Sequence, residues 1–323
     1  MISPALRAAP SRPDANIERH VDSFLAHGVV EFGQVLDPAS CGRLLAKIHA
    51  TRRFGSDLFL DEASFLTDPQ YKGVNPEPGR NLLETLGSAA GFVEEHELIG
   101  GVLAALLGDD YLVLDKKIVC GVPETWMPDW LARRVKGNPV NNLGPYIRPQ
   151  YRDITYFYGI DYHQDIIDWK NRSADFVTLY IYLHSVSAAD APLHVLLDSH
   201  RLGATVFPHA LARNAETGSW RYEDRRGGII ECAERMLVGG SGYAALWHSA
   251  ILHGTQPDKA DSERLSLRYL IAKEPGAGKA AIDTLNPSIA GPLSLTETRR
   301  DLDAQGAARI RQNAIAGFAG TAE

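Results

Sequence analysis

The chain has 323 residues, which is long enough for one large hydrophobic core or two modest ones. It carries 33 basic and 40 acidic residues, and the resulting net charge of -7 argues against a nucleic-acid partner, because phosphate binding needs a surplus of Lys and Arg. Its three cysteines form no CxxC pair and no apolar run is long enough to span a membrane, so a disulfide framework, a zinc ribbon and a membrane partner are not expected.

The amino-terminal third is predicted to be mainly helical. Residues 1–15 are expected to be disordered, and because they lack the apolar run of a signal peptide we expect a cytoplasmic protein. From residue 16 apolar side chains recur at helical spacing, and Asp37-Pro38 is a typical start of a second helix. The predicted order is a helix from 16, a strand at 29–32, a helix from 38, a long connection over 52–85 and a helix over 89–107.

The remainder of the chain is predicted to be rich in strands. Beyond residue 152 the hydrophobic period changes to two, which is typical of half-buried strands. Short strands without helices between them favour an antiparallel sandwich or barrel with flanking helices, a mainly β fold class. We expect one domain over 16–275, with its β core at about 111–275, and a helical extension over 276–323. Strand patterns lie at 111–119, 176–183, 193–197, 243–247 and 265–272.

One short motif and one distant histidine suggest a metal site. In an extended segment residues i and i+2 point the same way, so His163 and Asp165 of His163-Gln164-Asp165 converge on one point. His253 follows a predicted strand and supplies a second imidazole. Two histidines and one carboxylate form the facial triad of non-haem iron(II) oxygenases, which leaves three open coordination positions.

A buried cation is the next requirement of this chemistry. The co-substrate 2-oxoglutarate chelates iron through its 1-carboxylate and 2-oxo group, and its far carboxylate then needs a partner such as the planar fork of Arg. Arg264 lies eleven residues beyond His253, at the start of a predicted strand. Arg268 is an even number of residues further on, so its side chain would lie on the same face of the strand and it competes for this role. The spacing from His253 favours Arg264.

At these residues the chain resembles the phytanoyl-CoA dioxygenase family of iron/2-oxoglutarate oxygenases. Order and spacing agree over roughly residues 16–275. Two departures are Leu197-Asp198, where the family has Pro-Gly, and Ser241-Gly242, where it has Gly-Asp; neither is a metal ligand. The matching pieces are His163-Gln164-Asp165, the segment 192–203 with Ser199-His200-Arg201, the segment 242–248, His253-Gly254-Thr255 and Arg264.

The resemblance implies a double-stranded β-helix (jelly-roll) core with iron(II) at one mouth, held by His163, Asp165 and His253. It also implies that 2-oxoglutarate and O2 are co-substrates and that Thr255 helps Arg264 to hold the far carboxylate. Tyr156, from the aromatic stretch before the triad, is a further candidate for ligand binding. Tyrosines beside a strand are also commonly core packing.

The reaction implied is hydroxylation of an unactivated C–H bond, with release of succinate and CO2. Halogenating relatives keep Ala or Gly at the position of Asp165, so its carboxylate favours hydroxylation; desaturation, ring closure and epoxidation are related outcomes. The substrate would be a small metabolite, an amino acid or a natural-product intermediate. Five basic residues in the segment 130–152 would favour an anionic substrate if that loop were a lid, but a solvated basic loop explains them equally well.

Two other classes of function fit parts of the same pattern. A zinc-dependent hydrolase or lyase can use a His-Asp-His set with an open position, but it has no need of Arg264. A catalytically silent jelly-roll binding module needs none of these residues. Succinate release that depends on iron(II) separates the oxygenase from both.

Overall fold

The computed structural model describes residues 14–67, 71, 73, 75–76, 79–169, 172–285, 299–303, 308–315 and 318–322, the last range without its side chains. The disorder expected for residues 1–15 therefore falls mainly outside the described residues, and Ala15 already belongs to the first helix. None of the helices described combines the length and the apolar character that a membrane crossing requires.

The amino-terminal elements follow their local sequence signals. Helix α1 (Ala15–His27) begins after Asp14, whose carboxylate accepts a hydrogen bond from the backbone, and it ends at Gly28 in the left-handed conformation. Strand β1 (Val29–Gln34) and helix α2 (Pro38–Thr51) follow, and the Asp37 carboxylate caps α2. The predicted helix, strand and helix are confirmed at these positions.

The centre of the molecule is a curled sheet made of two halves. One half contains, in order, β1, β11 (Tyr243–His248), β5 (Phe176–Tyr182), β13 (Arg264–Ala272) and β2 (Leu112–Gly121). The other contains β4 (Thr155–His163), β12 (His253–Thr255), β6 (Leu193–Leu196) and β10 (Glu234–Leu237), with β3 (Val140–Asn142) paired to β4. The pair β2–β4 is parallel and joins the halves, and the other pairs of this sheet are antiparallel. The predicted mainly β jelly-roll architecture is confirmed.

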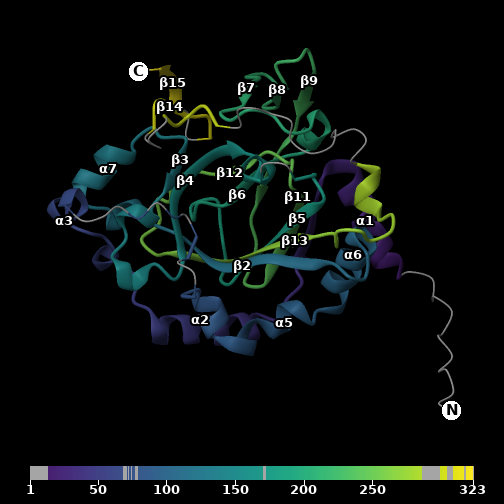
Figure 1. Cartoon of the computed structure of the whole chain (residues 1–323), viewed down its shortest axis with the longest axis horizontal. Coiled ribbons are helices and arrows are strands. Elements are labelled where there is room, and N and C mark those ends of the chain that lie inside the picture. Colours follow the sequence, from purple (N-terminus) through teal and green to yellow (C-terminus); the bar gives the residue numbers. More distant parts are fainter. Residues whose placement is uncertain are drawn as a thin grey trace.

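The two faces of the first half have different partners. Leu265, Leu267 and Tyr269 of β13 belong to the large apolar core that also contains buried side chains of α1, α2 and α6 (Glu97–Leu107). The alternate side chains of β13, which include Arg268, point into the barrel instead. Figure 1 shows α2 and α5 (Gly91–Glu94) below β2, with α1 and α6 at one side. The helices thus close the outer face and leave the inner face for a polar site.

The remaining elements surround this core. The predicted helix over 89–107 is divided into the turn η2, α5 and α6, because His96 adopts an extended conformation. The small sheets β7–β8–β9 and β14–β15 lie at the end of the molecule opposite α2 (Figure 1). The strands of these small sheets are β7 Ala210–Arg213, β8 Trp220–Glu223, β9 Ile229–Cys232, β14 Ile310–Asn313 and β15 Phe318–Ala322. The short α-helices are α3 Glu62–Thr67, α4 Leu82–Thr85 and α7 Asp129–Val135. The single 3-10 turns are η1 Ser56–Leu58, η2 Gly87–Ala90, η3 Glu124–Trp126, η4 Gly144–Tyr146, η5 Pro149–Tyr151, η6 Asp165–Asp168, η7 Ser199–Leu202 and η8 Ala281–Thr284.

The predicted helical extension over 276–323 is wrong for the part of it that the structure describes. There η8 is a single turn, and β14 and β15 form an antiparallel pair. Asp161 of β4 accepts hydrogen bonds from the backbone N–H groups of Ala314 and Ile315, so this segment is held against the sheet. Such tertiary contacts outweigh a weak helical propensity. Residues 286–298 and 304–307 lie outside the described residues.

Candidate metal centre and cofactor site

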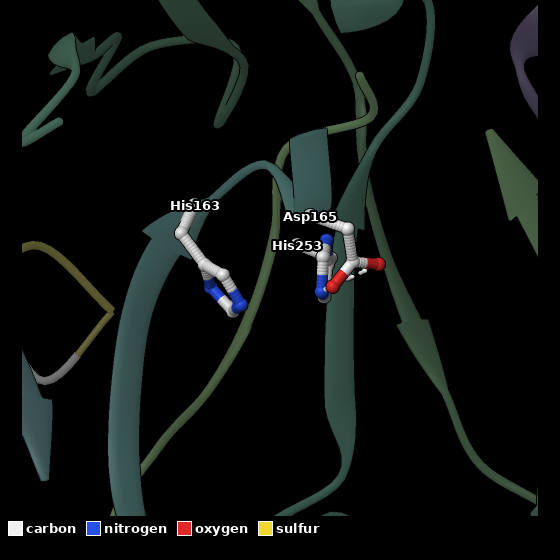
Figure 2. Close-up of side chains that lie close together, drawn as sticks. All are labelled: His163, Asp165 and His253. Carbon is white, nitrogen blue, oxygen red and sulfur yellow. Dashed lines mark ion pairs between the residues drawn. The ribbon is translucent and has the colours of Figure 1, made fainter. Parts of the chain in front are cut away.

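Two imidazoles and one carboxylate meet at one end of the barrel. His163 is the last residue of β4, Asp165 is the first of η6, and His253 is the first of β12. Because β4 and β12 pair with His163 opposite His253, the two rings are neighbours, with centroids 4.2 Å apart. The candidate ligand atoms of all three residues lie within 4.8 Å of one another, and Figure 2 shows the side chains converging. The structure therefore brings together the three residues that the sequence suggested.

Backbone carbonyls determine which nitrogen of each ring faces the centre. The Nδ1 atom of His163 lies 3.0 Å from the carbonyl oxygen of Asp161, and that of His253 lies 3.1 Å from the carbonyl oxygen of Ile251. A carbonyl can only accept, so each Nδ1 carries the proton and donates it. The Nε2 lone pairs are thereby left for a metal ion, which is the usual arrangement of ligating histidines.

The protonation states also suit metal binding. Burial lowers the pKa of His253 to about 3, with a further contribution from the neighbouring His163, and burial lowers the pKa of His163 as well. Both rings are therefore neutral near pH 7. Burial by itself would raise the pKa of Asp165, but the charge of Arg268 and the hydrogen bond from Thr178 hold it well below its ordinary value. Neutral imidazoles and an ionised carboxylate are the forms that bind a divalent metal.

Three neighbours orient the Asp165 carboxylate. The hydroxyl of Thr178 donates to Oδ2 over 2.6 Å, and the indole N–H of Trp247 donates to the same oxygen over 3.1 Å. Arg268 donates to Oδ1 over 2.5 Å. Oδ2 also lies 3.7 Å from Nε2 of His253, the contact drawn as a dashed line in Figure 2. The carboxylate is thus fixed beside the imidazoles by residues of β5, β11 and β13.

A cavity of about 590 Å³ opens from the triad into the barrel. Its wall combines charged residues with apolar and aromatic residues from strands of both halves of the sheet, from η6 and from the segments that follow η6 and η7. The charged residues are Asp115, Lys117, Asp165, Asp168, Arg268 and Arg299, and the apolar and aromatic ones include Leu114, Val119, Val140, Phe157, Ile160, Ile167, Trp169, Tyr180, Leu193, Phe207, Trp247 and Leu270.

Arg264 lies deep in the barrel beside this cavity. It is 1% exposed, and its guanidinium carbon lies 5.2 Å from the ring centre of Phe157 and 6.0 Å from that of Tyr180, two residues of the cavity wall. Its Nη1 donates to the carbonyl oxygen of Ala191, whereas Nε and Nη2 have no hydrogen-bond partner among the described residues. Buried donors without partners are costly, so a cation held in this way is suited to an anionic ligand.

The other two cofactor-binding candidates have different positions. Thr255 lines the cavity two residues beyond His253, and its hydroxyl donates to the same Ala191 carbonyl as Arg264, over 2.8 Å. Thr255 and Arg264 are therefore neighbours. Tyr156 is not part of the cavity wall: it belongs to the apolar core on the opposite face of β4 from Thr155 and Phe157. Its predicted ligand contact has no support in this position.

The basic segment 130–152 does not cover the cavity as a lid. None of its five basic residues, all of which the structure describes, lines the cavity wall. These are Arg133, Arg134, Lys136, Arg148 and Arg152. Arg148 and Arg152 donate to the backbone carbonyls of Phe59 and Ile147, and Arg134 stacks on the ring of Phe65. Part of the segment forms α7 instead of a loop. The cations that reach the cavity come from elsewhere, and the sequence signal for one of them was the charged run Asp115-Lys116-Lys117 within an otherwise apolar strand.

Comparisons with known proteins agree with this architecture. No protein-family model matches the chain. A segment of 116 residues is 29% identical to a protein of Stutzerimonas stutzeri described as a probable alpha-ketoglutarate-dependent hypophosphite dioxygenase. The match covers 35% of this chain and 38% of that relative, so it spans well under half of either protein.

The fold has a counterpart among solved structures. The epimerase SnoN, crystallised with Fe3+, alpha-ketoglutarate and nogalamycin RO, superposes with a TM-score of 0.50 over 88% of this chain and 98% of its own. The two sequences are 13% identical over this alignment. At this identity the likeness is one of fold: both chains form a jelly roll.

Proposed function

We propose that this protein is an oxygenase that depends on iron(II) and 2-oxoglutarate and resembles the phytanoyl-CoA dioxygenases. It would hydroxylate an unactivated C–H bond of a small molecule and release succinate and CO2. One observation carries the proposal: two Nε2 lone pairs and one carboxylate face a common point, and a buried guanidinium with donors that lack partners among the described residues lies next to Phe157 and Tyr180 of the same cavity wall. The short relative named as a dioxygenase supports the same class.

The roles of the residues follow from their positions. His163, Asp165 and His253 would hold the iron, and their fixed tautomers and ionised carboxylate require no rearrangement of protons. Iron(II) bound there supplies the redox chemistry that couples decarboxylation of 2-oxoglutarate to oxidation of the substrate. Thr178 and Trp247 keep the carboxylate in place.

Arg264 would bind the far carboxylate of 2-oxoglutarate. Thr255 lies two residues beyond His253 on β12, which is about 7 Å along an extended strand. Because Thr255 and Arg264 both donate to the Ala191 carbonyl, the guanidinium lies at a similar distance from the triad as the Thr255 hydroxyl. A five-carbon diacid chelated at the triad can reach such a point. Nε and Nη2 of Arg264 would then gain the acceptors that they lack.

Two features favour hydroxylation over the related classes. The resemblance implies that the carboxylate of Asp165 would hold the iron where halogenating relatives keep Ala or Gly. A zinc hydrolase on the same triad would have no use for a buried arginine with unpartnered donors. Arg264 thus argues for a co-substrate with a distant negative charge.

The test is a measurement of succinate formed from 2-oxoglutarate under air by protein loaded anaerobically with iron(II). We expect slow formation without substrate, faster formation with a suitable small molecule, and none after His253→Ala or replacement of iron by zinc. An absorption band in the visible spectrum marks 2-oxoglutarate that is chelated to iron(II). This band should appear for the wild-type protein and be absent in His253→Ala. Iron-independent turnover, or binding of 2-oxoglutarate that survives His253→Ala, would contradict the proposal.

A further inference from the structure

Two cations lie side by side on the cavity wall. Lys117 of β2 is directly opposite Arg268 of β13 in the antiparallel register, and both line the cavity. The lysine is 4% exposed, and the arginine side chain is 19% exposed. Like charges directly opposite each other on a sheet destabilise the strand pair, and burial adds a desolvation cost. A purely structural wall would not need this pair.

The nearby carboxylates offset these charges only in part. Arg268 is paired with Asp165, a proposed metal ligand, so that carboxylate would share its charge with the metal. Lys117 is hydrogen-bonded to the side chain of Asn75 and lies 3.4 Å from Asp115, which is itself partly exposed. Burial and the neighbouring Arg268 lower the pKa of Lys117 to about 8. Once the Asp165 carboxylate shares its charge with a metal ion, the pair Lys117 and Arg268 would have an excess of positive charge for a further anion.

The other cations at the cavity already have partners or another role. Arg299 donates to both carboxylate oxygens of buried Asp301, over 2.7 and 2.6 Å, and also lies 3.6 Å from Asp168. Arg264 is the proposed partner of 2-oxoglutarate. Lys117 and Arg268 each have one carboxylate partner, Asp115 and Asp165, whereas Arg299 has two, Asp301 and Asp168.

One part of the wall next to this pair is apolar. Leu270 follows Arg268 on the same face of β13, and Leu114, Ile167, Trp169 and Phe207 belong to one cluster with it. These side chains offer a surface for a hydrocarbon or aromatic group but no hydrogen-bond partner for a sugar or a peptide, apart from the indole of Trp169. The complement of the cation pair and this apolar part of the wall is a molecule with an acid group and an apolar body.

We propose that Lys117 and Arg268 anchor the substrate, and that the substrate is a small amphipathic acid whose oxyanion group, a carboxylate or phosphonate, lies between them. This inference rests on the proposed function and adds a substrate class to it. Because Arg268 directly contacts the metal ligand Asp165, an acid group bound there lies close to the metal centre. The C–H bond that is oxidised is therefore near the acid group of the substrate, and the apolar body points toward Leu270 and Phe207.

Paired probes test the anchor directly. Straight-chain carboxylates from propanoate to octanoate, the primary amides of the same lengths, and the matching alkylphosphonates are titrated by calorimetry into anaerobic protein loaded with iron(II) and 2-oxoglutarate. We expect at least one acid to bind and its amide to bind at least about tenfold more weakly, because hydrogen bonds to charged groups contribute that much or more. The carboxylate and phosphonate series show which oxyanion the site prefers.

Two lysine variants on one strand make a matched comparison. Lys117→Met, with Lys117→Gln as a second variant, should weaken binding of the acid at least about tenfold and leave binding of the amide unchanged. Lys116→Met is the control, because Lys116 is the preceding residue, lies on the outer face and is paired with Glu94. It should change neither affinity. The thermal midpoint of Lys117→Met should equal or exceed that of wild type, since one of two opposed cations is removed.

The results separate the anchor from the proposed function. The anchor is overturned if acids and amides bind equally or if no acid binds. It is also overturned if Lys117→Met weakens binding of 2-oxoglutarate as much as binding of the acid. The last outcome would assign Lys117 and Arg268 to the co-substrate. Failure of the proposed function shows elsewhere, as loss of the iron–2-oxoglutarate band in wild-type protein, and does not depend on which probe binds.

Discussion

Trp247 and Thr178, opposite each other on β11 and β5, donate hydrogen bonds to the same oxygen, Oδ2 of Asp165. A carboxylate held by two neighbouring strands keeps its orientation when a metal ion binds or leaves. Such outer partners of metal ligands typically contribute a factor of 10–100 to metal affinity. The triad thus depends on the sheet around it as well as on its own three side chains.

Removing these hydrogen bonds should weaken metal binding without unfolding the protein. We expect Thr178→Val and Trp247→Phe each to lower the affinity for iron(II) by roughly 10–100-fold, because the carboxylate loses its fixed orientation. Competition with a chelating dye under anaerobic conditions measures this affinity. Trp220→Phe is the control, since the Trp220 indole donates to Glu234 and not to Asp165. Unchanged affinity in both site variants would show that the sheet does not support the metal ligand.

Replacing Arg264 should affect 2-oxoglutarate selectively. Arg264→Gln is expected to raise the KM for 2-oxoglutarate by about 10–100-fold, the equivalent of one lost bidentate charge pair, while iron(II) affinity stays near that of wild type. Arg264→Lys should recover only part of the loss, because an ammonium group cannot reproduce the planar fork. Steady-state kinetics with varied 2-oxoglutarate measure both variants. An equal loss of iron affinity would mean that the residue supports the fold and not the co-substrate.

The triad and Arg264 could be predicted because their signals are local in sequence or fixed by spacing. His163 and Asp165 are two residues apart, and the helix caps at Asp14 and Asp37 depend only on their immediate neighbours. The position of Tyr156 was less accessible: it lies between Thr155 and Phe157, which line the cavity, but Ile160 lines it as well and Gly159 has a φ of 67°, so the alternation is interrupted between Tyr156 and His163.

Other features depend on contacts that the sequence pattern does not contain. The paired strands β14 and β15 occur where helix was predicted, and the carboxylate of Asp161, about 150 residues earlier, fixes the residues that follow β14. Arg148 and Arg152 suggested a basic lid, but charge alone does not say whether a guanidinium binds a ligand or a backbone carbonyl. Lys117 was detectable as a charge within a strand, whereas its pairing with Arg268 required the register of β2 and β13.

Acidic pH should destabilise the metal-free protein through its buried neutral histidines. Burial lowers the pKa of His248 from 6.5 to about 4, and its ring accepts from the Ala250 N–H while donating to the Ala174 carbonyl. Below pH 6.5 the unfolded chain binds a proton at this residue and the folded chain does not. Stability is therefore full above 6.5 and falls toward pH 4, by up to about 1.4 kcal/mol per pH unit for each such histidine.

Urea unfolding in the presence of a chelator, between pH 7 and 5, measures this dependence. His248→Gln should reduce the slope of unfolding free energy against pH by about one proton relative to wild type. The comparison with wild type is necessary because burial raises the pKa of Asp161 to about 6, which stabilises the folded state as the pH falls. Equal slopes in the two proteins would show that His248 is not held neutral by the fold.

Gly254, between His253 and Thr255, should be required for the close approach of β12 to β4. A Cβ atom at this position would lie 2.6 Å from the carbonyl oxygen of Ile160 and would also meet the side chain of Ile315. Gly254→Ala must therefore push β12 away from β4 and separate His253 from His163, at a cost of about 1–3 kcal/mol in stability. Metal affinity should fall by more than tenfold, measured with the same chelating dye.

Gly42 provides the matched control, because it lies in α2, is exposed, and has nothing within 4 Å of its added Cβ. Gly42→Ala should raise the free energy of unfolding by roughly 0.5–1 kcal/mol through the higher helix propensity of Ala, with no effect on metal affinity. A Gly254→Ala protein that is destabilised but binds iron(II) as tightly as wild type would mean that the spacing of the two strands does not set the geometry of the metal centre. If metal affinity falls in Gly254→Ala and not in Gly42→Ala, the backbone contact between β4 and β12 sets the geometry of the metal centre.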